Sequence, residues 1–126
     1  MYEFRLRGVE ILPATIGRIR ENICMILANL DPRLNNVNTS ELSAHSSLLH
    51  AMGLLTKGTG FLISSGYVVT AYHVVKNACR IVCLTPFNNF INLKLVKYDE
   101  SRDIALLEPE TRWSGGISIA DIELSL

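Results

Sequence analysis

The 126-residue sequence lacks both a long hydrophobic run and an excess of charge of either sign. No stretch reaches the roughly 18 uninterrupted apolar residues of a membrane-spanning helix, and no early segment has the residue order of a secretory signal. The 12 basic and 12 acidic residues cancel. The composition therefore gives no reason to expect a nucleic acid or a membrane as partner. We expect either a cytoplasmic location or a chain cut from a longer precursor.

The sequence also has few cysteines, and none of the three has a C-x-x-C spacing. Cys79 and Cys83 lie in a strand-like segment, where their Cα atoms would be about 13 Å apart, beyond the reach of a disulfide. Cys24 is distant in sequence, so reduced and buried thiols are expected. Cys24, His45 and His50 match no standard zinc-ligand spacing, and we expect neither a metal nor a cofactor.

Apolar residues make up 48% of the chain, which is typical of a globular protein with one core. Residues 1–50 are predicted to form a mixed N-terminal segment with one amphipathic helix over about 14–30, because isoleucine and leucine recur there at helical spacing. Asp31-Pro32 would end this helix, since the residue before a proline is disfavoured in the α region. Residues 41–55 fit either a helix or, in their second half, a strand.

Residues 51–126 have a different character and are predicted to be all β. Two β-branched runs are separated by Ser64-Ser65-Gly66, which indicates a hairpin. The runs CRIVCLT, FINLKLVKY and DIALLEPE follow, each separated from the next by turn-forming residues. Regular short strands of this kind favour a small antiparallel barrel.

One histidine stands at the end of an apolar run, in GYVVTAYHVV, and a later segment, RDIALLE, sets an aspartate directly before an apolar strand. A histidine that acts as a base needs an acid that holds its tautomer and stabilises the imidazolium. Asp103 is suited to hold His73 in this way, since the strand behind it would anchor it. Asp99 and Glu100 are rival acids, but both precede the strand in a part of the loop expected to be solvated.

Three motifs in order, GTGF, GYVVTAYHVV and RDIALL, resemble the trypsin-like serine proteases, particularly those of the Deg/HtrA type. The resemblance covers about residues 53–107. It implies the first antiparallel β-barrel of a double-barrel fold, a polypeptide substrate and no cofactor. It also implies that His73 is the general base and Asp103 the acid that orients it. The strand that packs beneath this pair in the family is matched by Gly58, Gly60 and Phe61.

The sequence departs from the family at the nucleophile. The family's serine lies in a Gly-x-Ser-Gly-Gly segment of a second barrel, whereas the only similar stretch here, WSGG, lacks the leading glycine and comes too early. Ser114 in this stretch is interpreted as part of a turn. Cys79 and Cys83 belong to the first barrel and are discounted as nucleophiles. We therefore expect base and acid without a nucleophile or oxyanion hole, and no activity of the chain alone.

Three hypotheses remain open at this point. The chain is the N-terminal half of a trypsin-like serine endopeptidase, or a non-catalytic interaction module that binds a second copy or another protein through its exposed barrel face. In the third, His73 is an ordinary buried histidine with a hydrogen-bond partner.

Overall fold

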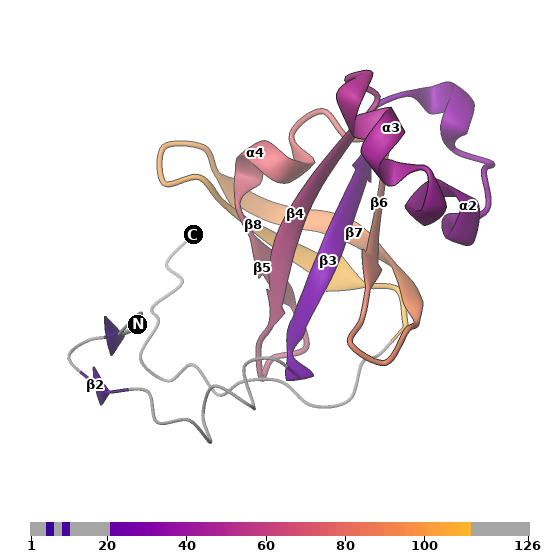
Figure 1. Ribbon diagram of the computed structural model, residues 1–126. Helices are drawn as coiled ribbons and strands as arrows, with labels where there is room; N and C mark the ends of the chain where they lie inside the picture. Colours follow the sequence, from indigo (N-terminus) through magenta and orange to yellow (C-terminus); the bar gives the residue numbers. More distant parts are fainter. Residues whose placement is uncertain (1–4, 7–8, 11–20, 112–126) are drawn as a thin grey trace.

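The computed structural model describes residues 5–6, 9–10 and 21–111 (Figure 1). The part of the predicted helix before residue 21 lies outside this range. So do Ser114 and the last predicted strand.

Six antiparallel strands close into a barrel, in the order β3-β4-β5-β8-β7-β6. A separate two-stranded pair is formed by β1 (Arg5–Leu6) and β2 (Val9–Glu10). The predicted mainly β fold with an antiparallel barrel is thereby confirmed, including the hairpin between the fourth and fifth strands. The barrel strands are β3 (Ile23–Asn29), β4 (Leu55–Leu62), β5 (Val68–Thr70), β6 (Arg80–Leu84), β7 (Phe90–Asp99) and β8 (Ile104–Pro109).

The helix predicted over residues 14–30 is wrong for residues 23–29, which form β3 between β4 and β6. Ile26 points into the barrel and Leu27 points outward, yet both are fully buried. A strand that is buried on both faces carries apolar residues without alternation, and periodicity alone does not distinguish it from a buried helix. Because β3 is a barrel strand, the barrel extends into the segment 1–50 that was predicted to precede it.

Two short helices follow β3 and lead into β4. A 3₁₀ turn, η1 (Pro32–Leu34), comes first, and the helices α2 (Thr39–Ala44) and α3 (Ser46–Ala51) follow it. The stretch 41–55, which the sequence left ambiguous, is therefore helical in most of its length and reaches the first residue of β4 at its end. Asn38 caps α2, since its side chain accepts a hydrogen bond from the Ser40 amide.

These helices give β3 its second buried face. Leu42 of α2 packs with Leu27 of β3 and Leu55 of β4 in a small cluster outside the barrel. Figure 1 shows α2 and α3 on the right of the barrel, with α4 (Tyr72–Val75) on the left beside the hairpin of β7 and β8. The two helical regions therefore occupy different sides of the same barrel.

The interior of the barrel is packed so closely that β4 needs glycine. A Cβ atom added to Gly60 would lie 2.7 Å from Ile26 Cδ1 and from Val68 Cγ1. The next residue, Phe61, points to the other face, and 39% of its surface is exposed. The glycine-rich strand matched in the sequence therefore packs through its glycines, while its phenylalanine lies outside.

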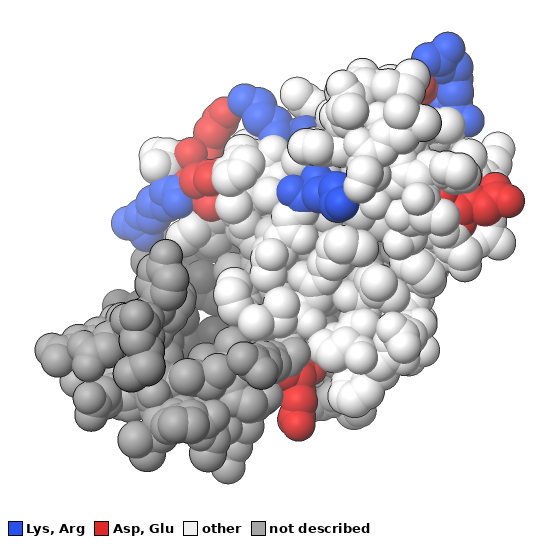
Figure 2. Space-filling view, viewed as in Figure 1, with Lys and Arg blue, Asp and Glu red and all other residues white. Residues whose placement is uncertain are grey.

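Charged side chains are scattered over the face shown in Figure 2, with both signs interspersed and no large area of one sign. No helix within residues 21–111 is both long and apolar enough to cross a membrane.

Candidate active site

His73 lies in the four-residue helix α4, which directly follows β5. Val74 and Val75 face the core and are 5% and 2% exposed, whereas the His73 side chain is 72% exposed. The valines around the histidine therefore anchor its backbone, while its ring points to solvent. The hypothesis of an ordinary buried histidine is wrong.

Asp103 is the residue directly before β8 and has a left-handed backbone, with φ of 55°. Few residues other than glycine adopt this conformation, although aspartate tolerates it better than most. The Asp103 amide donates to the Glu100 carbonyl at 3.2 Å, which closes the turn between β7 and β8. The turn directs the Asp103 side chain toward α4.

The two side chains meet in a tight contact. His73 Nδ1 lies 2.5 Å from Asp103 Oδ2, and the His73 backbone amide donates to Asp103 Oδ1 at 2.7 Å. In the reverse direction, the Tyr72 amide donates to the Asp103 backbone carbonyl at 3.1 Å. Three hydrogen bonds thus join the start of α4 to one aspartate.

These bonds define the protonation of the pair. Hydrogen bonds from the His73 side chain and then from its backbone lower the pKa of Asp103 below its usual 3.8, so the carboxylate is ionised near neutral pH. An ionised carboxylate only accepts hydrogen bonds, so His73 Nδ1 carries a proton. In the neutral ring the lone pair is then on Nε2, which is the arrangement that a general base requires.

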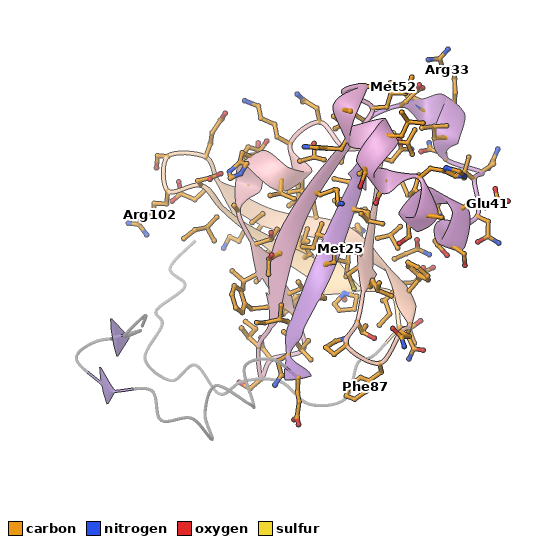
Figure 3. All side chains as sticks on the ribbon, viewed as in Figure 1. Met25, Arg33, Glu41, Met52, Phe87 and Arg102 are labelled. Carbon is orange, nitrogen blue, oxygen red and sulfur yellow. The ribbon has the colours of Figure 1, made fainter. Side chains whose placement is uncertain are left out.

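The two rival acids are engaged elsewhere. Asp99 Oδ1 accepts from Ser101 Oγ at 2.7 Å and from the Arg102 amide at 3.2 Å, which stabilises the turn. Figure 3 labels Arg102 at the outer side of this turn. Glu100 forms an ion pair with Lys76 at 2.8 Å. Of the three acids in the turn, Asp103 is the one that contacts His73.

Fold stability does not account for this geometry. The His73 and Asp103 side chains are 72% and 46% exposed, and exposed ion pairs contribute only about 0–1 kcal/mol. The left-handed backbone of Asp103 costs about as much or more. The pair therefore contributes little net free energy to folding.

The elements beneath the pair hold α4 close to the barrel. A Cβ atom on Gly58 would lie 2.6 Å from both Cγ atoms of Val74, so α4 rests directly on β4 at a position that only glycine permits. Thr70 Oγ1 donates to the Thr59 carbonyl at 2.8 Å and fixes the end of β5 just before α4.

Sequence reasoning missed a second set of contacts around α4. The rings of Tyr72 and Tyr98 stack with centroids 4.3 Å apart and planes 5° apart. Lys76 at the end of α4 pairs with Glu100 of the β7–β8 turn. Tyr98 could have been noticed as an aromatic residue a few positions before the acid, but its partner depends on the closure of the barrel.

The candidate zinc ligands are not brought together. Within the described part of the chain, no three histidine, cysteine or acidic side chains form a group that could hold a metal ion. His50 Nδ1 instead lies 3.0 Å from the Leu55 carbonyl oxygen.

All three cysteines are free, and the side-chain hydrogen bond of Cys79 and the hydrogen bonds of His73 go to different residues. Cys24 and Cys83 are buried together inside the barrel, and their hydrogen bond together with burial raises the pKa of the Cys24 thiol well above its usual value. Cys79 is exposed, and its Sγ donates to the Asn29 carbonyl at 3.2 Å. The contact between Cys24 and Cys83 follows from the pairing of β3 with β6, which the sequence does not reveal.

Residues 58–124, just over half of the chain, match the family described as trypsin-like peptidase domain. The chain belongs to the trypsin-like peptidase family. Among curated proteins, the chain is 39% identical over 67 residues to a probable periplasmic serine endoprotease, DegP-like, of Pseudomonas putida strain GB-1. A protein of the same description from strain W619 is 37% identical over the same length. Each match covers 52% of this chain but only 14% of the relative.

Solved structures support the fold of this trypsin-like peptidase chain. The serine endoprotease of Yersinia pestis aligns with a TM-score of 0.51 at 20% identity, over 74% of this chain and 27% of that one. The HtrA-type protease AlgW, solved with a tripeptide, aligns with a TM-score of 0.56 at 16% identity, over 77% and 25% of the two chains. The resemblance to the Deg/HtrA type noted in the sequence is confirmed.

The predicted cytoplasmic location is contradicted, because the matched relatives are named periplasmic endoproteases. The prediction rested on composition and on the lack of a signal-like segment. The sequence of a folded domain does not indicate its compartment, because export is directed by a signal peptide that is removed from the mature protein.

Proposed function

We propose that this chain supplies the general base and the orienting acid of a serine endopeptidase, with His73 as the base and Asp103 as the acid. The observation that supports this most directly is the contact of His73 Nδ1 with Asp103 Oδ2 at 2.5 Å on an exposed surface. The family membership and the named endoprotease relatives agree with it.

In the proposed reaction, His73 Nε2 takes the proton of a serine hydroxyl as the serine oxygen attacks the peptide carbonyl. The imidazolium that forms is stabilised by the ionised carboxylate of Asp103. His73 then returns the proton to the leaving amine, and a water molecule repeats the cycle on the acyl-enzyme. Asp103 remains ionised throughout, consistent with its lowered pKa.

The serine is proposed to come from a second barrel that packs against the exposed side of His73. Within residues 21–111, no hydroxyl or thiol group makes a hydrogen bond to the His73 ring. The high exposure of His73 leaves room for such a partner surface. The chain spans about one-seventh of the length of its curated relatives, so the activity of a whole protease is a proposal here.

A fluorophosphonate probe, which labels activated serines, tests the division of roles. The 126-residue chain alone is expected not to be labelled, and labelling is expected when a second barrel with a Gly-x-Ser-Gly-Gly segment is joined to it. In that joined protein, His73→Ala should reduce peptide hydrolysis by at least about a thousandfold. His50→Ala is the matched control, since His50 Nδ1 is also hydrogen-bonded but to the Leu55 carbonyl, and His50 lies near the end of α3.

Labelling of the chain alone would contradict the expected absence of a nucleophile. Full activity of His73→Ala in the joined protein would contradict the role of the base. The coding sequence that follows Leu126 offers an independent check, because a reading frame that encodes a Gly-x-Ser-Gly-Gly segment would identify the source of the serine.

The alternative of a non-catalytic interaction module stays a prediction. The large exposed apolar side chains are spread over several elements: Leu48 and Met52 at α3, Phe61 in β4, Phe87 in the β6–β7 turn, and Val96 and Tyr98 in β7. Phe87, labelled in Figure 3, lies at the other end of the barrel from α4. No single surface among the described residues favours this alternative over the peptidase.

A further inference from the structure

The stacked pair Tyr72 and Tyr98 borders the candidate active site but has no part in the proposed proton transfers. Tyr72 is the first residue of α4 and precedes His73 directly. Tyr98 lies in β7 opposite Ala105 of β8, just before the turn that carries Asp103. Their rings are parallel to within 5° at a centroid distance of 4.3 Å. The stack therefore joins the element of the base to the hairpin of the acid.

The helix α4 is too short to hold its own orientation. It has four residues, and its N-cap residue, Ala71, offers no side-chain hydrogen bond. Isolated helices of this length do not form, because nucleation is unfavourable. The position of His73 therefore depends on what packs against α4. Val74 and Val75 face the core, and Tyr72 is partly buried against the same core while its ring also stacks on Tyr98.

The turn on the other side also depends on outside contacts. Its left-handed residue, Asp103, is held by the Glu100 carbonyl and by the bonds to α4. Lys76 and Glu100 add an ion pair between α4 and the turn, but both side chains are about half exposed or more, so this pair is weak. An aromatic stack is less sensitive to solvent and salt than an exposed ion pair.

We infer that Tyr98 is a positioning residue, which stacks on Tyr72 and thereby keeps His73 Nδ1 against the Asp103 carboxylate. This inference rests on the proposed function, since it gives the stack a role in aligning the base with its acid. A purely structural role would stabilise the barrel as a whole without a specific effect on the His73 ring.

The test uses the full 126-residue chain with ¹⁵N-labelled histidine, observed by NMR. The wild-type protein should show the His73 Nδ1 proton hydrogen-bonded to Asp103, and Asp103→Asn should shift or remove that signal. Tyr98→Ala should remove or broaden it and should speed hydrogen exchange of the His73 amide by about two- to tenfold, the range expected for loss of a stack. His50 serves as an internal reference, because its Nδ1 contacts the Leu55 carbonyl instead.

Three further variants separate positioning from stability. Tyr98→Phe retains the stacked ring and should keep the wild-type His73 signal. Val96→Ala removes another exposed side chain of β7, 46% exposed against 52% for Tyr98, and should leave His73 unchanged. Tyr98→Leu retains an apolar side chain and replaces Tyr98→Ala in the test if that variant does not fold. Tyr98→Leu should likewise remove or broaden the signal of the His73 Nδ1 proton.

The outcomes are distinct. A wild-type His73 signal in Tyr98→Ala or Tyr98→Leu, in a protein where Asp103→Asn changes it, would overturn the positioning role and leave the proposed function intact. Equal changes at His73 and His50 would also overturn it, because they would indicate general loosening. A wild-type spectrum that Asp103→Asn does not alter would overturn the catalytic pair itself.

Discussion

Asp103 combines two roles that are usually separate, since it ends the β7–β8 turn through its backbone and holds His73 through its side chain. The left-handed backbone of Asp103, with φ of 55°, places its backbone carbonyl and its side-chain carboxylate within hydrogen-bond reach of α4. The carboxylate uses one oxygen for the His73 ring and the other for the His73 amide, so the ring cannot turn without breaking a bond. The orientation and the tautomer of the His73 ring thus depend on this carboxylate.

The lowered pKa of Asp103 predicts a pH-dependent contribution to stability. A carboxyl group with a lower pKa in the folded chain stabilises the fold above its unfolded value and loses that contribution as the pH falls through the folded value. Wild type should therefore be more stable than Asp103→Asn at neutral pH, and the difference should close as the pH falls below 3.8. Urea denaturation over a pH series measures it, and asparagine is chosen because it tolerates positive φ.

Asp31 provides the matched control, since its pKa is also lowered, by Arg33, at a site away from α4. The free energy of unfolding of Asp31→Asn should be lower than that of wild type at neutral pH, and this difference should also close at low pH. The His73 NMR signal should be unchanged in Asp31→Asn. A difference between wild type and Asp103→Asn that persists at low pH would show that the ionised carboxylate is not the cause.

At the scale of elements, the site depends on how closely α4 approaches β4. This approach is possible because Gly58 has no side chain beneath Val74. Both Cγ atoms of Val74 would meet an added Cβ, and a β-branched side chain cannot rotate both away. A close helix–strand contact therefore sets the height of His73 above the barrel.

Gly58→Ala is expected to destabilise the protein by about 1–3 kcal/mol, as overpacking does in other cores. The double variant Gly58→Ala/Val74→Ala should lose less stability relative to Val74→Ala than Gly58→Ala loses relative to wild type, because the two 2.6 Å contacts are gone and only the 3.1 Å contact with the Cβ atom of residue 74 remains. Urea denaturation of the four proteins completes the cycle. If Gly58→Ala is as stable as wild type, α4 is not seated on β4 as described.

At the scale of the whole molecule, the closed barrel separates an inaccessible interior from a reactive surface. The Cys24 and Cys83 side chains lie within the barrel, and Cys79 lies on its surface. An alkylating reagent must reach the sulfur atom to react, and buried cysteines are inert for that reason, whereas exposed ones are accessible. The three cysteines should therefore differ sharply in reactivity.

In the native protein, iodoacetamide is expected to label Cys79 and to leave Cys24 and Cys83 unmodified until the chain is denatured. Peptide mass spectrometry identifies the labelled residues, and Cys79→Ser is the control that should abolish native labelling. Rapid native labelling of Cys24 would indicate that the barrel opens easily at β3 and β6.

The strands that were predicted correctly from the sequence are those whose local pattern of apolar and turn-forming residues is enough to define them. The strands from β4 to β8 alternate or are bounded by turn residues, and they were recognised for that reason. His73 and Asp103 were singled out from their motifs, and the structure brings them together. Helix α4 was not foreseen, because it is a single turn inside a run of valines.

The sequence by itself determined the β-rich character of most of the chain, the choice of His73 and Asp103, and the kinship to trypsin-like peptidases. These features are recorded in short motifs and in local propensity. Only the tertiary structure decided that Ile23–Asn29 is a strand, because its second face is covered by helices that follow it in the chain. The left-handed turn at Asp103 and the stack of Tyr72 on Tyr98 likewise depend on barrel closure, which brings together residues that are distant in sequence.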